Sequence, residues 1–189
     1  MEYSETIKRA LEVLKNGGVI LYPTDTVWGL GCDATNEEAV RKVFEIKKRA
    51  DSKSLVLLAS DLDMVARYVK EIPSIAIDLV EVNDRPMTII YPQGQMLAPS
   101  TMAQDGSVGI RIPMHDFCIE LVRKLRKPLV STSANISGEP TPKTFAEIPD
   151  AIKSAVDYIV PKALEEGATG QASQILKVGL RGEIEIIRA

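Results

Sequence analysis

The sequence predicts an α/β fold in which a twisted mixed sheet is covered by helices. Short continuous apolar runs alternate along the chain with longer amphipathic segments, as in proteins built from strands and covering helices. Two closing apolar runs, residues 173–178 and 183–188, flank Gly179 and Gly182 and suggest an antiparallel pair. The 189 residues contain no repeat and no long linker, so we expect a single domain over residues 1–189.

Capping residues mark where the expected helices begin and end. Ser4 and Asp61 each precede an amphipathic segment and can accept hydrogen bonds from its first amides. Thr35 followed by Glu38 matches a capping box, which predicts that the second helix begins there. Glycines at 17–18 end the first helix. The expected helices cover about 4–16, 35–47, 61–69, 74–82 and 116–125.

Apolar runs bounded by glycine, proline or polar residues mark the expected strands. Three polar stretches adjoin these strands: TDT at 24–26, the basic loop at 47–53 and STSAN at 131–135. Because ligands of open α/β sheets usually bind beyond the strand ends, we expect these stretches to meet there. The expected strands are 19–23, 55–59, 87–92, 107–113, 128–133, 157–161, 173–178 and 183–188.

Composition narrows the functional classes. The formal net charge of −3 argues against a protein coated in positive charge for duplex binding, but it permits a local basic cleft. No stretch approaches the roughly 18 apolar residues of a membrane span, and the charged N-terminal segment lacks a signal-peptide core. Cys32 and Cys118 have no metal-ligand spacing and are expected as buried thiols. We therefore expect a cytoplasmic protein without membrane attachment.

A basic stretch at residues 47–55, KKRADSKSL, brings Lys47, Lys48, Arg49 and Lys53 close together. Cations at the end of a helix complement its dipole, and this structural role is one interpretation. Three adjacent cations also repel one another unless an anion or acidic side chains compensate them. Because arginine offers a planar fork and lysine a compact charge, the alternative interpretation is a polyphosphate site.

Two polar stretches are candidates for the rest of a ligand site. STSAN, residues 131–135, either caps its own backbone or forms the polar floor of a site. In YPTDTVWGLGCDA, residues 22–34, Gly29 and Gly31 permit close approach of the backbone. Neither GxGxxG nor GxxxxGK[ST] is present, so side chains from several loops would have to hold a nucleotide. His115 is the only histidine and has no acid partner that the sequence can place, which disfavours a serine hydrolase.

Two arginines lie on expected strands. Arg111 stands between apolar neighbours in VGIRIP and therefore needs a partner, either an internal acid or a ligand carboxylate. Arg188 repeats this pattern at the end of EIEIIR, where solvent reaches it more easily.

Together these stretches resemble the YrdC/Sua5 family. YPTDTVWGLGCDA, KKR followed by KSL, VGIRIP and STSANISGEP occur in the order and spacing of that family, and the resemblance runs from about residue 5 to 189. The chain is most similar to the short, single-domain form. The resemblance implies the YrdC-like (YrdC/RibB) α/β fold, whose sheet surrounds a deep, basic, concave cleft.

The resemblance also implies an activity. The family condenses L-threonine, bicarbonate and ATP, with Mg²⁺, into threonylcarbamoyl-AMP and pyrophosphate. Further proteins then transfer the threonylcarbamoyl group to adenosine 37 of tRNA, so those transfer proteins are implied as downstream partners. Either tRNA or double-stranded RNA is a further candidate ligand.

Motif positions carry implied residue roles. Lys47 and Arg49 match the Lys-x-Arg pair and are implied to act as the catalytic residues on the phosphates. Ser133 and Asn135 match the Ser-x-Asn pair, with the serine toward threonine and the asparagine toward the nucleotide. The resemblance implies ATP contacts for Arg49, Lys53, Ser107, Asn135, Lys143, Thr144 and Arg188, threonine contacts for Thr26, Arg111, Ser133 and Ser173, and no protein metal ligand.

The sequence departs from the family pattern mainly on the threonine side. Ser54 replaces a proline, and Leu58 stands where a histidine often contacts threonine. NDRPMT at 83–88 replaces WPGPLT, and ASQ at 172–174 replaces PST. A YciO-like relative with altered activity is therefore an alternative. A module that binds RNA or a nucleotide without turnover is another, although 5% aromatic residues offer few stacking platforms.

Overall fold

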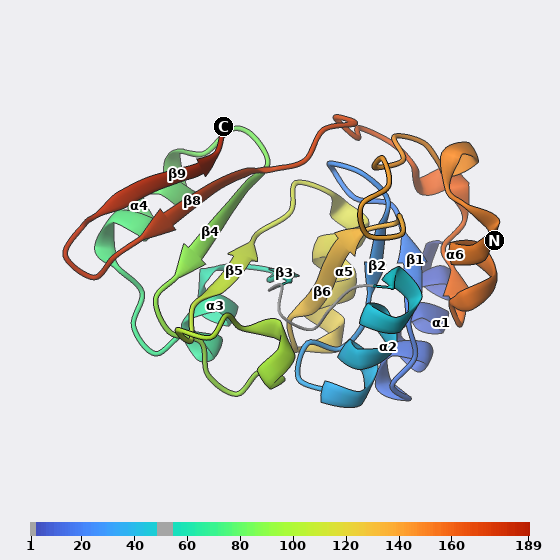
Figure 1. Cartoon of the computed structure of the whole chain (residues 1–189), viewed down its shortest axis with the longest axis horizontal. Helices are drawn as coiled ribbons and strands as arrows, with labels where there is room; N and C mark the ends of the chain where they lie inside the picture. The colour runs from blue at the N-terminus through green and yellow to red at the C-terminus, as the bar shows by residue number, and fades with distance from the viewer. Residues whose placement is uncertain (1–2, 49–54) are drawn as a thin grey trace.

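The computed structural model describes residues 3–48 and 55–189, which form one nine-stranded sheet (Figure 1). The strands are β1 (Ile20–Tyr22), β2 (Gly29–Gly31), β3 (Val56–Leu58), β4 (Met87–Tyr91), β5 (Val108–Arg111), β6 (Leu129–Ser133), β7 (Tyr158–Ile159), β8 (Gln174–Val178) and β9 (Ile184–Arg188). They lie in the order β7-β1-β2-β6-β3-β5-β4-β8-β9. Three neighbouring pairs are parallel and five are antiparallel, so the predicted mixed α/β sheet is confirmed.

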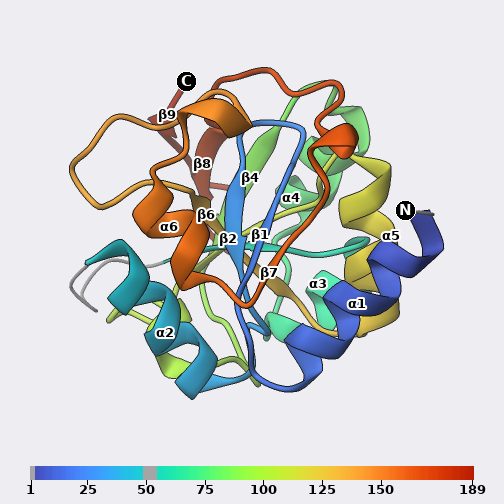
Figure 2. The same cartoon turned by 90° about the vertical axis from the view of Figure 1, so that its right-hand side faces the viewer.

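Helices cover both faces of the sheet (Figure 2). They are α1 (Tyr3–Lys15), α2 (Glu37–Lys47), α3 (Leu62–Tyr68), α4 (Ser74–Val82), α5 (Asp116–Leu125) and α6 (Asp150–Ala155), with short 3₁₀ turns at Pro99–Thr101, Phe145–Glu147 and Lys162–Leu164. In Figure 2, α1, α3 and α5 lie on one side of β1 and β2, and α2 and α6 lie on the other. None of the helices within the described ranges is long and apolar enough to cross a membrane.

Helix α1 shows how the sequence pattern produces this packing. Its buried residues Ile7, Ala10 and Leu14 recur every three or four positions and share one face, which packs toward α5. Gly17 adopts φ 75°, a left-handed conformation that glycine reaches without a Cβ clash, and the helix ends there as predicted. The amphipathic pattern therefore determines both the buried face and the length of the helix.

Strand β2 is a feature that the sequence analysis did not predict. Two of its three residues are glycines, which weaken strand propensity, but β1 and β6 pair with it on either side. A Cβ on Gly31 would lie 2.5 Å from Tyr22 Cε1 and 2.8 Å from the Val130 carbonyl oxygen. Glycine is thus required because the buried Tyr22 ring crosses β2, where its hydroxyl donates to the Val130 carbonyl at 3.0 Å. The close approach at Gly31 is thus to Tyr22 and to β6, and close approach of a ligand to this backbone stays a prediction.

The predicted capping box of α2 is wrong. Asn36 is the N-cap, and its Oδ1 accepts a hydrogen bond from the Ala39 amide at 3.1 Å. The Thr35 hydroxyl instead donates to Asp33 Oδ1 at 2.7 Å, because a local turn competes for it. Asp61, by contrast, caps α3 as predicted, and both cysteines are buried free thiols.

The closing hairpin of β8 and β9 is antiparallel, as predicted. Its register shifts between Ile175 and Leu176, so that Ile175 lies opposite Arg188 while Leu176 lies opposite Ile186. The extra residue on β9 is Ile187, and a bulge of this kind re-aims the side chains beside it. Ile187 and Arg188 consequently both line cavities on one face of the sheet.

Candidate functional site

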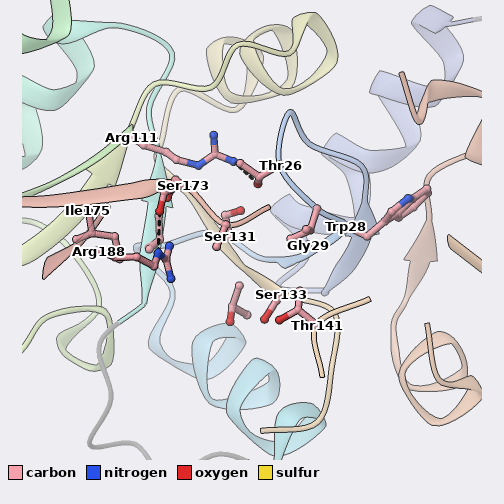
Figure 3. A pocket seen from close by; sticks show the side chains of 14 residues that line it. Thr26, Trp28, Gly29, Arg111, Ser131, Ser133, Thr141, Ser173, Ile175 and Arg188 are labelled. Carbon is pink, nitrogen blue, oxygen red and sulfur yellow. Dashed lines mark hydrogen bonds between the residues drawn. The ribbon is translucent and has the colours of Figure 1, made fainter. Parts of the chain in front are cut away.

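A cavity of about 300 Å³ opens on the face of the sheet between β2, β6 and the closing hairpin (Figure 3). The expectation that ligand groups would gather beyond strand ends is only partly met, since many lining residues lie within strands. Ser131 and Ser133 are two positions apart on β6, so the strand period places both side chains on the same face. The lining residues are Thr26, Val27, Trp28, Gly29, Val56, Arg111, Ser131, Thr132, Ser133, Thr141, Ala172, Ser173, Ile175 and Arg188.

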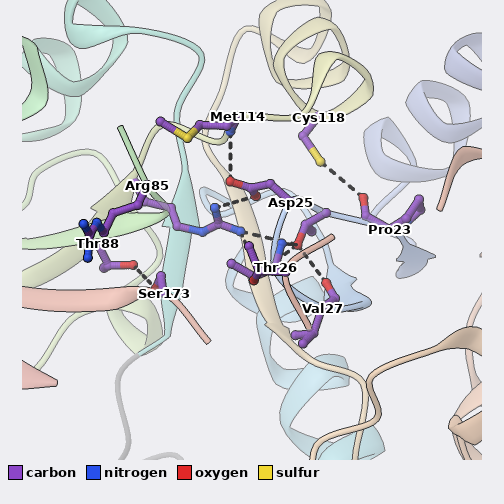
Figure 4. Close-up of polar contacts among 12 residues, drawn as sticks. Pro23, Asp25, Thr26, Val27, Arg85, Thr88, Met114, Cys118 and Ser173 are labelled. Carbon is purple, nitrogen blue, oxygen red and sulfur yellow. Dashed lines mark hydrogen bonds and ion pairs between the residues drawn. The ribbon is translucent and has the colours of Figure 1, made fainter. Parts of the chain in front are cut away.

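Arg111 lies in a buried polar network at one side of the cavity, and Figure 4 shows the network members Asp25, Thr26 and Met114. Its side chain is 3% exposed, and its Nη1 donates to Asp25 Oδ1 at 2.6 Å. Its Nη2 donates to Thr26 Oγ1 at 3.1 Å. The Met114 amide donates to the second Asp25 oxygen at 3.0 Å. Of the two partners considered for Arg111, the structure therefore supplies the internal acid, and a contact with a ligand carboxylate stays a prediction.

Arg188 enters the same cavity from β9. Its Nε donates to the Ser173 carbonyl at 2.8 Å, and burial lowers the pKa of its guanidinium from the ordinary value. The Ser173 hydroxyl in turn exchanges a hydrogen bond of 2.8 Å with the buried Thr88 hydroxyl. In Figure 3, Arg111, Ser173 and Arg188 lie on one side of the cavity, and Ser133 lies opposite them.

The two stretches that the sequence analysis linked, at Lys47 and at 133–135, do meet. The Lys47 side chain is buried, and its ammonium donates to the carbonyl oxygens of Ser133 at 2.5 Å and Asn135 at 2.8 Å. The Ser137 amide also donates to the Lys47 carbonyl at 2.8 Å. Lys47 is not among the residues that line the cavity; it supports the backbone of the segment that does.

Other predicted site residues are placed less directly. Arg49 and Lys53 lie outside the described residues. Ser107 lines an adjoining cavity of about 330 Å³, which shares Val56 and Ile175 with the first. Asn135 donates from Nδ2 to the carbonyls of Ile136 and Glu139, each at 3.0 Å, while its buried Oδ1 has no hydrogen-bond partner among the residues that the structure describes. Neither Lys143 nor Thr144 is among the lining residues, so their contacts with ATP stay predictions.

Several residues of the site were not assigned from the sequence, and three of them are informative. Ser131 lines the cavity beside Ser133, and the two-residue strand period could have indicated it. Asp25 holds Arg111, and its place in the polar turn next to Thr26 was the available signal. Thr141 lines the cavity from a loop, and no local pattern in the sequence distinguishes it from its neighbours.

The electrostatics of the cavity favour an anionic ligand. Of the lining residues that the structure describes, the charged ones are Arg111 and Arg188. Asp25 compensates the first, so the second supplies the less compensated positive charge at the wall. Within residues 3–48 and 55–189, no group of three or more histidine, cysteine, aspartate or glutamate side chains could hold a metal ion.

Comparisons with known proteins identify the family. A family model for the Sua5, YciO and YrdC proteins, described as Telomere recombination, matches residues 12–189. The chain belongs to this family. The threonylcarbamoyl-AMP synthase of Hahella chejuensis (strain KCTC 2396) is 32% identical over 159 residues, which are 84% of this chain and 86% of that protein. The enzyme of the same name from Stenotrophomonas maltophilia (strain K279a) is 35% identical over 172 residues, 89% of this chain and 90% of that protein.

Solved structures of the Sua5/YciO/YrdC family share the fold. A variant of P. abyssi Sua5 has a TM-score of 0.84 at 26% identity, over 94% of this chain and 54% of that chain. P. abyssi Sua5 complexed with L-threonine has a TM-score of 0.83 at 24% identity, over 94% of this chain and 52% of that chain. The chain thus spans about half the length of the Sua5 chains that it matches, and the predicted fold is confirmed.

Proposed function

We propose that the protein is an L-threonylcarbamoyladenylate synthase, an ATP-dependent enzyme that serves tRNA modification. One observation carries the proposal. A single cavity brings together Thr26, Arg111, Ser133 and Arg188, which the family motifs assign to threonine and ATP. Curated relatives 32–35% identical to the chain carry the name threonylcarbamoyl-AMP synthase.

The proposed chemistry suits the residues of this cavity. The amine of threonine and bicarbonate form a carbamate with loss of water, and a carbamate oxygen then attacks the α-phosphorus of ATP. The bond from the α-phosphorus to the bridging oxygen breaks, and pyrophosphate leaves. Such a transfer depends on positioning and on neutralising phosphate charge, and hydroxyl groups and arginines are suited to both. His115 lies outside the lining, and its Nε2 is 3.1 Å from the Leu164 carbonyl, so it takes no part in the proposal.

We assign the two substrates to neighbouring parts of the one cavity. Thr26, Ser133 and Ser173 would contact threonine, and Arg188 would contact the nucleotide. Arg49 and Lys53 remain sequence predictions for the phosphates, because they lie outside the described residues. Lys47 would act by holding residues 133–135 in place and by adding positive charge beneath them.

Magnesium would enter with the nucleotide. No carboxylate lines the part of the cavity that the structure describes, and both oxygens of Asp25 already accept hydrogen bonds. Mg²⁺ commonly keeps several waters and binds substrate phosphates, so it does not require a dedicated protein cage. When bound, the ion would neutralise phosphate charge, which is the chemistry that the arginines supplement.

Pyrophosphate release tests the proposal. The protein is incubated with ATP, Mg²⁺, bicarbonate and L-threonine, and pyrophosphate is measured against reactions that lack threonine or bicarbonate. We expect release that requires both. Release equal to that of the threonine-free reaction would refute the assignment.

A variant pair localises the activity to the cavity. Arg188→Met should lower kcat/KM for ATP about 10–100-fold, because a charge-assisted contact to phosphate is lost. Arg181→Met is the matched control, since Arg181 is exposed at the turn of the same hairpin and does not line the cavity. Equal kinetics of the two variants would contradict the assigned role of Arg188.

The downstream partners follow from the proposed product. Threonylcarbamoyl-AMP is a mixed anhydride that water can hydrolyse, so a transferase that acts on tRNA must accept it promptly. Direct binding of tRNA or double-stranded RNA by this chain is a separate proposal. It predicts an affinity that falls steeply with salt.

A further inference from the structure

A chain of hydrogen bonds beside the cavity has a fixed direction. The Thr24 hydroxyl lies 2.7 Å from the Val27 carbonyl oxygen, and a carbonyl can only accept. Thr24 must therefore donate its one hydroxyl hydrogen to Val27. Thr24 Oγ1 can then only accept, and it accepts from the Thr26 amide at 3.0 Å. Arg111 Nη2 is a further, longer neighbour at 3.4 Å and lies closer to Thr26 Oγ1, at 3.1 Å, so the shorter contacts with Thr26 take the two acceptor sites of Thr24.

The direction passes on to Thr26. The two threonine hydroxyl oxygens are 2.9 Å apart, and since Thr24 has no hydrogen left, Thr26 is the donor of this pair. Thr26 Oγ1 also accepts from Arg111 Nη2 at 3.1 Å. A hydroxyl oxygen has two acceptor sites. On Thr26, Arg111 occupies one of them, so one lone pair remains to accept a hydrogen bond. Thr26 lines the cavity, whereas Thr24 does not.

Asp25 keeps Arg111 in this arrangement. The Asp25–Arg111 pair is buried, with side-chain exposures of 5% and 3%, and the Met114 amide holds the other carboxylate oxygen. Arg111 can only donate, so it cannot reverse the direction of the chain. One end of the network is the Val27 carbonyl, which can only accept, and the other is the Arg111 guanidinium, which can only donate. The direction of the hydrogen bonds between them is therefore determined.

We propose that Thr24 is a positioning residue that makes Thr26 an acceptor toward the cavity, so that this wall selects a ligand group that donates a hydrogen bond. The Arg111 guanidinium already points at the same oxygen, so an ammonium group would bring a second cation to it. A neutral hydroxyl fits better, and the side-chain hydroxyl of a β-hydroxy amino acid is such a donor. The choice of ligand class rests on the proposed function.

The test compares L-threonine with O-methyl-L-threonine, whose ether oxygen can accept but not donate. Affinities are measured by calorimetry with a non-hydrolysable ATP analogue and without bicarbonate, so no turnover is needed. The wild type should prefer L-threonine. In Thr24→Val, the Thr26 hydrogen is released and can be donated to the ether, so this preference should fall about tenfold. Thr24→Ser keeps the donor to Val27 and should retain the preference.

A matched control separates this effect from lost stability. Thr101 is a fully buried threonine whose hydroxyl also donates to a backbone carbonyl, that of Ala98 at 2.6 Å, and it does not line the cavity. Thr101→Val should be destabilised similarly, yet keep the wild-type preference. The proposal is overturned if Thr24→Val also keeps that preference.

A second variant pair covers the case in which Thr24→Val does not fold. Thr26→Val should weaken the binding of L-threonine about tenfold and leave the affinity for L-valine unchanged. Thr26→Ser should bind both amino acids as tightly as the wild type does. If Thr26→Val binds both amino acids as tightly as the wild type does, the inference is refuted. If pyrophosphate release fails but these preferences hold, only the synthase assignment falls. If pyrophosphate is released but the variants keep the ligand preferences of the wild type, only this inference is refuted.

Discussion

Lys47 is a buried cation that donates to backbone carbonyls. The residue is 3% exposed, and its ammonium donates to the carbonyls of Ser133 and Asn135, which lie 86 and 88 positions further along the chain. The helix-dipole interpretation correctly places Lys47 in the last turn of α2. The tertiary contacts add a second role, because the charge fixes the strand end that lines the cavity.

We predict that Lys47→Met lowers the free energy of unfolding by about 3 kcal/mol. The methionine fills a similar volume but leaves two carbonyls without a charged donor. Chemical denaturation followed by circular dichroism measures the change. Lys8→Met, at an exposed position of α1, should stay within about 0.5 kcal/mol of wild type. A comparable loss in the two variants would show that the carbonyl contacts are unimportant.

At the scale of the element, the end of α2 is strained. Lys48 is the C-cap residue and has φ 50° and ψ 43°, in the left-handed region that favours glycine. Its amide nevertheless bonds the carbonyls of Phe44 and Glu45, so the conformation is the one that ends the helix. Arg126 ends α5 in the same region with φ 61°.

We predict that Lys48→Gly and Arg126→Gly each raise the free energy of unfolding by about 0.5–1 kcal/mol, because glycine relieves the Cβ clash. Urea titration is the measurement. Lys8→Gly, inside a regular helix, should do the opposite and cost about 1 kcal/mol. If all three variants lose stability, the left-handed conformation of Lys48 and Arg126 does not lower the stability of the wild type.

The start of α3 predicts a dependence on pH. Hydrogen bonds from the Ser60 hydroxyl and the Met64 amide lower the pKa of Asp61 from its ordinary value. A carboxyl with a lowered folded pKa contributes stability above its unfolded pKa of about 3.9, and this is lost as pH falls through the folded value.

Asp61→Asn should therefore change stability little at pH 7, because asparagine is also a good N-cap. It should flatten the loss of stability between about pH 5 and pH 2. Thermal unfolding at a series of pH values compares the variant with wild type. An identical acid profile for both proteins would rule out this contribution.

At the scale of the whole molecule, the cavity exists only in the folded chain. Its walls come from segments as distant as Thr26 and Arg188, which meet because β8 and β9 extend the sheet beyond β4. Segment 169–173 completes the wall, since the amides of Thr169 and Gly170 donate to the carbonyls of Asp25 and Thr26. Ligands of the cavity should therefore bind the native state and not the unfolded one.

We predict that ATP and L-threonine together raise Tm by about 10–20 °C when each is near 100 times its Kd, through selective binding to the folded state. Differential scanning fluorimetry measures the shift. D-threonine with ATP is the matched control, because it has the same groups in the opposite configuration. A shift equal for both enantiomers would mean that the cavity does not bind the amino acid specifically.

Local patterns in the sequence predicted much of the fold. The bounds of α4 and α5, the cap at Asp61 and the closing hairpin follow from amphipathic spacing and turn residues. The capping box at Thr35 failed because Asp33 competes for its hydroxyl. Strand β2 was missed because its pairing with β1 and β6 overrides the low propensity of its glycines.

By itself, the sequence determined the fold class, the family and the meeting of Lys47 with residues 133–135, because these depend on periodicity and on motif spacing. Only the tertiary structure decided that Asp25 is the partner of Arg111 and that Lys47 holds carbonyls. It also showed that Ser131 and Thr141 share the cavity with Ser133. The physical reason is that a buried polar group takes whichever partner the packed chain brings within about 3 Å. Spacing along the chain does not report that distance.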